Sequence, residues 1–185
     1  GHTENGIYAL RANYGFDGLN PEAIFAFRSI KSKLTGHGEA HLNPEGVFIS
    51  NGPLGSGVGQ AQGLALADKI IGNDRITICA LSDGGSMEGE AKEGFAAIPG
   101  LAKRGHLNPF LLLISDNNTK LSGRIDADSF SMNPTFSSLQ TLGWKVITVE
   151  DGHDLQKIYT SIESATAELS KNAKTPICIV YKTIK

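Results

Sequence analysis

Carboxylate and amide side chains follow two apolar runs of the chain, and their types suit the binding of a hard metal ion. Asp83 follows the mostly apolar residues 75–81 after a single serine, and Asn117 and Asn118 follow the mostly apolar residues 110–115. Oxygen ligands of this kind suit Mg²⁺ or Ca²⁺ rather than zinc. Mg²⁺ usually takes few protein ligands and completes its shell with water and phosphate oxygens. Each turn alone also suits an ordinary surface loop, but the two together predict a magnesium–phosphate site.

A glycine-rich segment precedes these turns. Residues 52–59 contain four glycines and lead directly into a predicted helix. Glycines let the backbone approach a ligand closely, and the N–H groups at a helix N-terminus favour phosphate. No Gly-Lys-Ser/Thr follows, so the segment is not a Walker A loop. A tight turn with close helix packing is the alternative interpretation.

Helical and strand patterns alternate around these turns. The residues predict helices over 20–34, 56–71, 87–99, 135–142 and 154–169, strands over 46–50, 75–81, 110–115, 144–149 and 176–183, and a polar loop over 116–126. Most of the strands are apolar throughout, as in sheets that are covered on both faces. We therefore predict an α/β fold with a doubly wound, mostly parallel sheet and helices on both faces. Ligands bind such sheets beyond the carboxyl ends of the strands, where both polar turns lie.

Composition excludes several classes of protein. The chain has 185 residues with a formal charge of −2, which predicts one domain over 1–185 and no nucleic-acid binding. No apolar run approaches the roughly 20 residues of a membrane span, and residues 1–5 do not resemble a secretory signal. Cys79 and Cys178, the two cysteines, lie in apolar runs and form no disulfide framework. A cytoplasmic location is expected.

The motifs resemble the transketolase family, in its N-terminal, diphosphate-binding domain. Asp83-Gly84 followed by Asn117-Asn118 is similar to the thiamine-diphosphate motif. Further matches extend over essentially the whole chain: Gly1-His2, Gly36-His37-Gly38-Glu39, Gly52-Pro53-Leu54-Gly55, Met87-Glu88-Gly89, Leu142-Gly143-Trp144 and Lys182-Thr183-Ile184. The resemblance implies a thiamine-diphosphate-binding fold with thiamine diphosphate and Mg²⁺ (or Ca²⁺) as cofactors.

The resemblance also implies the residues of the metal and diphosphate site. Asp83 and Asn118 would bind the metal through their side chains, and the backbone carbonyl near Lys120 would complete the protein ligands. Gly84, beside Gly85, would give its backbone N–H to the diphosphate. Asn118 would contact the cofactor as well.

Catalytic and ring-binding roles follow from the same resemblance. His2 would face the diphosphate or the substrate, and His37 would lie near the reactive thiazolium ring; both are the expected catalytic residues. Leu54, in the loop with Gly52 and Pro53, would pack on the cofactor rings. Glu88, counted with the cofactor-binding residues, and Glu93 would belong to an acidic cluster at a subunit interface; a solvated helix face is the alternative for both.

Departures from the family pattern are visible. Ser82 stands where the family has glycine, Gly38 replaces a proline, and the spacing from Asp83 to Asn118 is a few residues longer than expected. Relative to the family, the chain is expected to be truncated at both ends. Nothing in it resembles the pyrimidine-binding domain, so we expect a homodimer, or a heteromer with a pyrimidine-binding domain or subunit.

The expected function is transfer of a two-carbon ketol unit between sugar phosphates, together with that missing domain. One alternative is the thiamine-dependent component of a 2-oxo-acid dehydrogenase, which the residues 1–8 also resemble. A second is a non-catalytic dimerisation or regulatory module, favoured by Ser82 and the missing segments. A third, a Mg²⁺-dependent phosphotransfer domain, would need further carboxylates around Asp83.

Overall fold

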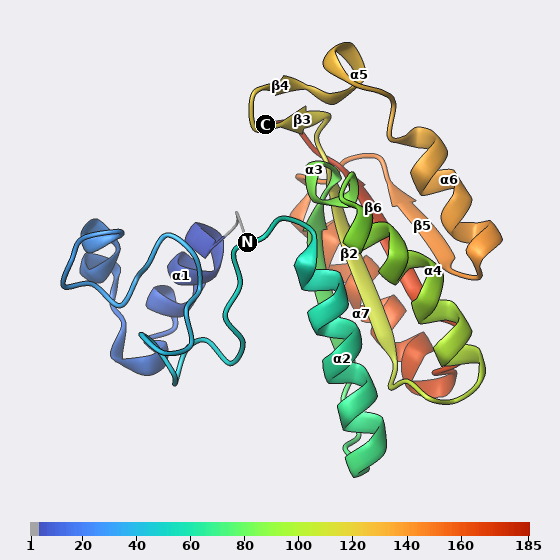
Figure 1. Ribbon diagram of the computed structural model, residues 1–185, viewed down its shortest axis with the longest axis horizontal. Coiled ribbons are helices and arrows are strands. Elements are labelled where there is room, and N and C mark those ends of the chain that lie inside the picture. The colour runs from blue at the N-terminus through green and yellow to red at the C-terminus, as the bar shows by residue number, and fades with distance from the viewer. Residues whose placement is uncertain (1–3) are drawn as a thin grey trace. The chain divides into compact units, whose positions relative to one another are not determined.

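The computed structural model describes residues 4–185 and forms two compact units (Figure 1). The first unit ends at Ser56, and the second runs from Gly57 to Lys185. The prediction of a single diphosphate-binding domain over 1–185 stays a prediction.

The first unit is built from short helices and turns. It contains α1 (Glu4–Asn13) and two 3-10 helices, η1 (Phe16–Gly18) and η2 (Pro21–Ala26). Its small core consists of Tyr8, Ala12, Leu19 and Leu34, with Ala23 and Phe27 packed against it. Asn20 caps η2, since its side chain accepts a hydrogen bond from the Ala23 amide at 2.9 Å.

Two elements predicted for this unit are wrong. The helix expected over 20–34 is the short η2, because the chain turns at Arg28, which has a positive φ and donates its amide to the Leu34 carbonyl at 2.8 Å. The strand expected over 46–50 is absent from the described structure. There the amides of Gly46 and Val47 both donate to the Asn43 carbonyl, and this local turn takes up the hydrogen bonds a strand would need.

The second unit contains a four-stranded parallel sheet in the order β1-β2-β6-β5. Its strands are β1 (Thr77–Ser82), β2 (Phe110–Asp116), β5 (Lys145–Val149) and β6 (Ile177–Lys182). Its helices are α2 (Ser56–Ile71), α3 (Asp83–Ser86), α4 (Gly89–Lys103), α5 (Ile125–Asp128), α6 (Asn133–Leu142) and α7 (Leu155–Lys171). The predicted α/β fold with a parallel sheet is confirmed.

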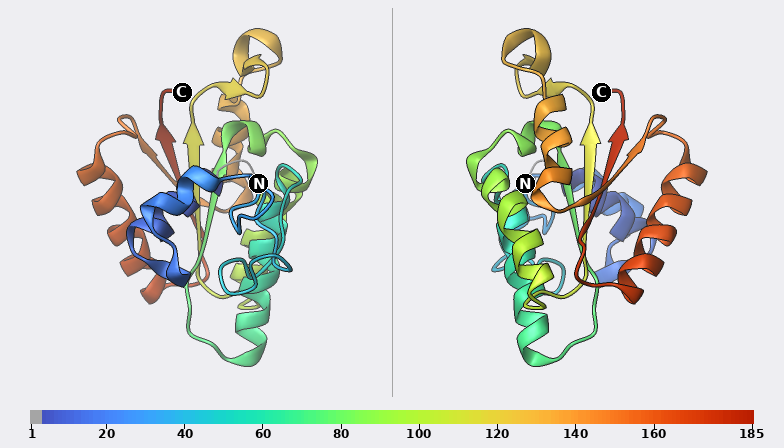
Figure 2. Two further views of the ribbon diagram at one scale, coloured as in Figure 1. Left: turned by 90° about the vertical axis from the view of Figure 1, so that its left-hand side faces the viewer. Right: turned by 90° about the vertical axis from the view of Figure 1, so that its right-hand side faces the viewer.

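Helices cover both faces of the sheet (Figure 2). On one face, residues of α2, α4 and α6 pack with Leu112 and Ile114 of β2. On the other face, Ala165 and Leu169 of α7 pack with Leu111 and with the intervening Leu113. Alternation along β2 therefore sends apolar side chains into both layers, and this explains its continuous apolar sequence.

Three details differ from the predictions for this unit. Helix α4 passes through Pro99 and ends at Lys103; Pro99 is buried and lies against Gly143, where a Cβ would come within 3.1 Å of its ring. The loop over 116–126 contains a small antiparallel hairpin, β3 (Thr119–Lys120) and β4 (Gly123–Arg124). Strand β1 is an edge strand of the sheet, and its Ile78 side chain is 50% exposed rather than covered.

Candidate metal and diphosphate site

The polar turns meet at the carboxyl-terminal ends of the sheet's strands. Parallel pairing places Ser82 of β1 opposite Ser115 of β2, and Asp116 opposite Lys182 of β6. The carboxyl ends of these three strands therefore lie side by side, below the β3–β4 hairpin at the top of Figure 1. Ligands of α/β folds bind beyond these carboxyl-terminal strand ends.

A buried carboxylate joins two of the turns. Asp83 is fully buried, and its Oδ1 accepts the Gly84 amide at 2.8 Å. Its Oδ2 accepts the amides of Asn117, at 2.8 Å, and of Asn118. The carboxylate thus holds the turn after β1 against the turn after β2. Burial raises the pKa of Asp83, an effect that the three N–H donors oppose and the nearby Asp116 reinforces.

Ser82 caps the short helix that begins at Asp83. Its Oγ accepts the Gly85 amide at 3.1 Å, and its carbonyl accepts the Ser86 hydroxyl at 2.9 Å. A side-chain oxygen at this position is the usual N-cap arrangement. The serine that departs from the family pattern therefore has a structural role, and the Asp83 turn forms around it.

Amide side chains complete the second turn. Asn118 has a positive φ of 55°, and its Oδ1 accepts the Asp126 amide at 3.0 Å. The Asn117 Oδ1 is buried beside this turn and has no hydrogen-bond partner. An unpaired buried acceptor is costly unless something binds it.

These oxygens fit a divalent cation with few protein ligands. An ionised carboxylate has about four lone-pair positions, and the three N–H donors leave Asp83 with one. The unpaired Asn117 oxygen is a second available acceptor. Both available donors are oxygens, which suit Mg²⁺ or Ca²⁺ better than zinc.

The structure brings Lys120, Gly84 and Gly85 to the same place. The backbone of β3 lies against Gly84, where a Cβ would be 3.6 Å from the Thr119 carbonyl oxygen. A Cβ on Gly85 would come within 2.7 Å of Leu81 Cδ1, so a larger residue there would require the Leu81 side chain to move. The Lys120 ammonium pairs with Asp128 at 2.8 Å, so its side chain is occupied and only its backbone is a candidate metal ligand.

The remaining predicted residues are placed as follows. His2 lies outside the described residues. In the first unit, the His37 Nδ1 is 3.9 Å from Glu4 Oε1, and the His37 ring is 3.8 Å from the position of a Cβ on Gly52. The carbonyl of Pro53 accepts the Ser56 hydroxyl at 2.8 Å, and Leu54 is half-buried.

Glu88 and Glu93 belong to α4. Glu88 is the N-cap residue of the helix, without a side-chain capping bond, and Glu93 is exposed. This placement is compatible with either of the two roles expected from the sequence.

Three residues next to the Asn117 turn make contacts that the sequence motifs did not predict: Asp116, Lys182 and Thr183. Lys182 pairs with Asp116, and the Thr183 amide donates to the Asp116 carbonyl at 2.9 Å. With the asparagines they line a polar hollow of about 270 Å³. The lysine at the end of the last apolar run was the only sequence signal for this contact. Its pairing with Asp116 follows only from the sheet order, which places β6 beside β2.

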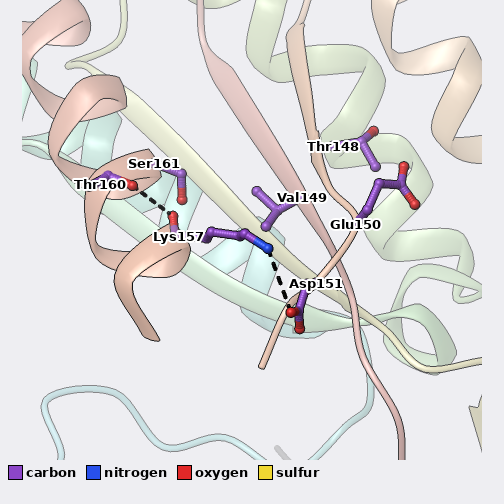
Figure 3. Close-up of a pocket in the computed structure, with 7 residues that line it drawn as sticks. All are labelled: Thr148, Val149, Glu150, Asp151, Lys157, Thr160 and Ser161. Carbon is purple, nitrogen blue, oxygen red and sulfur yellow. Dashed lines mark hydrogen bonds and ion pairs between the residues drawn. The ribbon is translucent and has the colours of Figure 1, made fainter. Parts of the chain in front are cut away.

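A second hollow follows β5, between that strand and the first turns of α7 (Figure 3). The Lys157 ammonium points to Asp151, 3.6 Å from its Oδ2, and lies 3.4 Å from Asp154. The Lys157 and Asp151 side chains are more than half exposed, and the single ammonium is shared between the two carboxylates. This hollow therefore lacks the buried, partly unpaired oxygens of the Asp83 site.

Within residues 4–185, no helix is long and apolar enough to cross a bilayer.

The chain is similar to proteins of one family. Residues 1–184 match the family described as "Transketolase, thiamine diphosphate binding domain". Transketolase 1 of Pasteurella multocida is 34% identical over 194 residues, which cover 100% of this chain and 27% of that protein. The chain thus spans about a quarter of the length of the curated relatives it matches.

Solved structures agree with this match. Transketolase of Campylobacter jejuni gives a TM-score of 0.79 at 30% identity, covering 96% of this chain and 27% of that one. Transketolase of Pichia stipitis in complex with sedoheptulose 7-phosphate gives 0.81 at 26% identity, covering 96% of this chain and 26% of that one. Fold, motifs and whole-chain similarity therefore agree: the chain belongs to the transketolase family, in its thiamine-diphosphate-binding domain.

Proposed function

We propose that this chain supplies the metal- and diphosphate-binding half of a transketolase-like enzyme, which transfers a two-carbon ketol unit between sugar phosphates. The observation that carries the proposal is the buried Asp83 carboxylate, held by the amides of the Asn117–Asn118 turn beside an unpaired amide oxygen. Such a cluster is costly in a merely structural turn, because the buried Asn117 Oδ1 is left without a donor.

The metal ligands of the proposal are the side chains of Asp83 and Asn118 and the backbone carbonyl of Lys120. Mg²⁺ is the proposed ion, with Ca²⁺ as the other candidate, because the available donors are all oxygens. Gly84 and Gly85 allow the diphosphate to approach the backbone. The Gly84 amide donates to Asp83 in the structure, so its predicted bond to the diphosphate would have to be shared or exchanged.

His2 and His37 are the proposed acid–base groups. Imidazole titrates near neutral pH and can therefore hold or release a proton beside the substrate. Leu54, with Gly52 and Pro53, would pack on the cofactor rings and exclude water from them. When bound, thiamine diphosphate supplies the carbon nucleophile and the electron sink of the reaction.

A second domain or subunit is part of the proposal. The relatives are about four times longer than this chain, so a pyrimidine-binding domain would come from the same protein or from a partner, in a homodimer or a heteromer. Glu88 and Glu93 are the proposed interface residues. The sedoheptulose 7-phosphate in the Pichia stipitis enzyme supports sugar phosphates as the substrate class.

We place the protein in the cytoplasm on the state of its cysteines. Cys79 and Cys178 are both unpaired and buried, and burial raises the pKa of the Cys79 thiol to about 12. Unreactive buried thiols without disulfides are typical of reducing compartments.

Calorimetry of the chain with thiamine diphosphate tests the proposal. We expect micromolar binding that requires Mg²⁺ and is lost in Asp83→Asn, which keeps the shape of the side chain but removes its charge. The matched control is Asp151→Asn, because Asp151 also follows a strand of the sheet but is exposed. Binding that is independent of Mg²⁺, or equal in wild type and Asp83→Asn, would overturn the assignment of the site.

A further inference from the structure

The last residues of β6 hold the Asp116 turn in place. The Lys182 Nζ lies 2.5 Å from Asp116 Oδ2, and the Asp116 side chain is only 11% exposed. A buried carboxylate of this kind needs a partner, because an unpaired charge in a protected position is strongly unfavourable. Lys182 is the cation that the structure gives it.

Hydrogen bonds hold the backbone around Lys182 on both sides. The Thr183 amide donates to the Asp116 carbonyl at 2.9 Å, and the Ser115 and Thr183 hydroxyl oxygens are 2.8 Å apart. On the opposite side, the Gly152 amide donates to the Lys182 carbonyl at 2.8 Å. A Cβ at Gly152 would come within 2.7 Å of that carbonyl oxygen, so this approach requires glycine. These hydrogen bonds therefore hold in place the backbone from which the Lys182 side chain extends.

Asp116 is joined directly to the candidate metal site. The next two amides of the chain, Asn117 and Asn118, are those that donate to Asp83. The Asp116 carboxylate carries the same charge as Asp83 and belongs to the residue before Asn117, whose amide donates to Asp83, so the two carboxylates repel each other. An ammonium on Asp116 both anchors the turn and offsets this repulsion.

We propose that Lys182 is a positioning residue of the metal and diphosphate site: through Asp116 it holds the Asn117–Asn118 turn with its amides toward Asp83. This inference rests on the proposed function for its effect on cofactor binding. Its structural part, the order of the turn, can be measured without any cofactor.

The chain offers a matched control for a general effect of removing a lysine. Lys157 also pairs with a carboxylate after a strand of the same sheet, Asp151, and both side chains are more than half exposed (Figure 3). Exposed ion pairs contribute little to stability. Lys157→Met therefore removes the same charge from the same sheet edge without touching the Asp116 turn.

The first experiment measures thiamine diphosphate affinity in the presence of Mg²⁺ by calorimetry. Groups that orient metal ligands typically change affinity 10–100-fold when removed, so we expect Lys182→Met to bind about tenfold more weakly than wild type. Lys182→Arg, which keeps the cation, should restore most of the affinity, and Lys157→Met should bind as wild type does. In an Asp116→Asn background, Lys182→Met should cause little further loss, because Lys182 acts through Asp116.

The second experiment measures amide hydrogen exchange in the chain without cofactor. We expect faster exchange of the Asn117 and Asn118 amides in Lys182→Met, with unchanged exchange of the Leu112 amide in the centre of β2. Lys157→Met should leave all three amides unchanged. A general loss of stability would instead accelerate the Leu112 amide as well.

The outcomes separate the two claims. Equal cofactor affinity or unchanged Asn117 and Asn118 exchange in Lys182→Met would overturn the positioning role, even if wild type binds thiamine diphosphate. Additive losses in the double variant would overturn the route through Asp116. A wild-type chain that binds no thiamine diphosphate would overturn the proposed function and the cofactor part of this inference, while faster exchange in Lys182→Met would still establish the structural link.

Discussion

The two compact units satisfy their buried polar groups to different degrees. Among the described residues, six buried side-chain polar atoms lack a hydrogen-bond partner, and five of them belong to Arg11, Asn43 and Asn51 in the first unit. The sixth is the Asn117 Oδ1 in the candidate metal site. Among the described residues of the second unit, the one unsatisfied atom therefore lies in the candidate site; in the first unit, such atoms are spread through a region of short helices and turns.

The difference follows from the elements each unit contains. Residues 57–185 form parallel strands and long helices, which pair backbone groups regularly and bury continuous apolar faces. Residues 4–56 have one helix of ten residues and a core of four buried side chains. We expect the second unit to be the more stable of the two and to carry the metal site on a rigid edge.

Removing a core side chain should have the largest effect. Leu112→Ala in β2 should lower the free energy of unfolding by about 3–5 kcal/mol, because Leu112 is fully buried between packed layers. Leu34→Ala is the matched control in the first unit, where the smaller cluster can relax, and it should cost about 2 kcal/mol. Urea unfolding of both variants checks this, and an equal or larger loss for Leu34→Ala would contradict the comparison.

Limited proteolysis should distinguish the units next. Phe48 is 86% exposed in a segment without helix or strand, whereas Phe130, the most exposed phenylalanine of the second unit, is 47% exposed, and Phe95 and Phe110 are buried in α4 and β2. Chymotrypsin should therefore cut after Phe48 before it cuts anywhere in 57–185. Mass spectrometry of the first fragments identifies the site, and a first cut within the sheet would show that the comparison is wrong.

The smallest expected effect concerns the cap of α7. Amides of Lys157 and Gln156 lower the pKa of Asp154, so its stabilising contribution is present above the unfolded pKa and is lost as the pH falls through the lowered, folded pKa. Asp154→Ala should therefore be less stable than wild type at pH 7, and the difference should shrink in acid. Asp154→Asn, also a good cap, should remove this pH dependence. Thermal unfolding of the three proteins between about pH 2 and pH 7, a range that brackets the normal Asp pKa of about 3.9, checks this prediction.

The same contrast explains what the sequence could predict. Residues 110–115 form a continuous apolar run and residues 56–71 have a helical period, and the structure contains β2 and α2 where these patterns predict them. Residues 20–34 have a helical period too, but Ile30 is fully exposed and Arg28 adopts a positive φ, because the loop closes on Leu34. A period predicts a helix only when tertiary contacts use its apolar face.

The candidate site was predictable in part for a related reason. Asp83 and Asn118 each follow an apolar run closely, so their meeting at the same end of the sheet follows from parallel pairing. The role of Asp116 and Lys182 does not follow, because they are 66 residues apart and meet only when β6 lies between β2 and β5. Strand order depends on packing of all the helices, which local patterns do not encode.

Paramagnetic Mn²⁺ in place of Mg²⁺ shows whether the turns after β1 and β2 hold the metal. With thiamine diphosphate present, we expect selective broadening of the NMR amide signals of Asp83, Gly84 and residues 117–120, and its loss in Asp83→Asn. Signals from the exposed acidic turn at residues 150–157 should stay sharp. Broadening centred on that turn, or broadening that persists in Asp83→Asn, would show that the metal does not bind between the turns after β1 and β2.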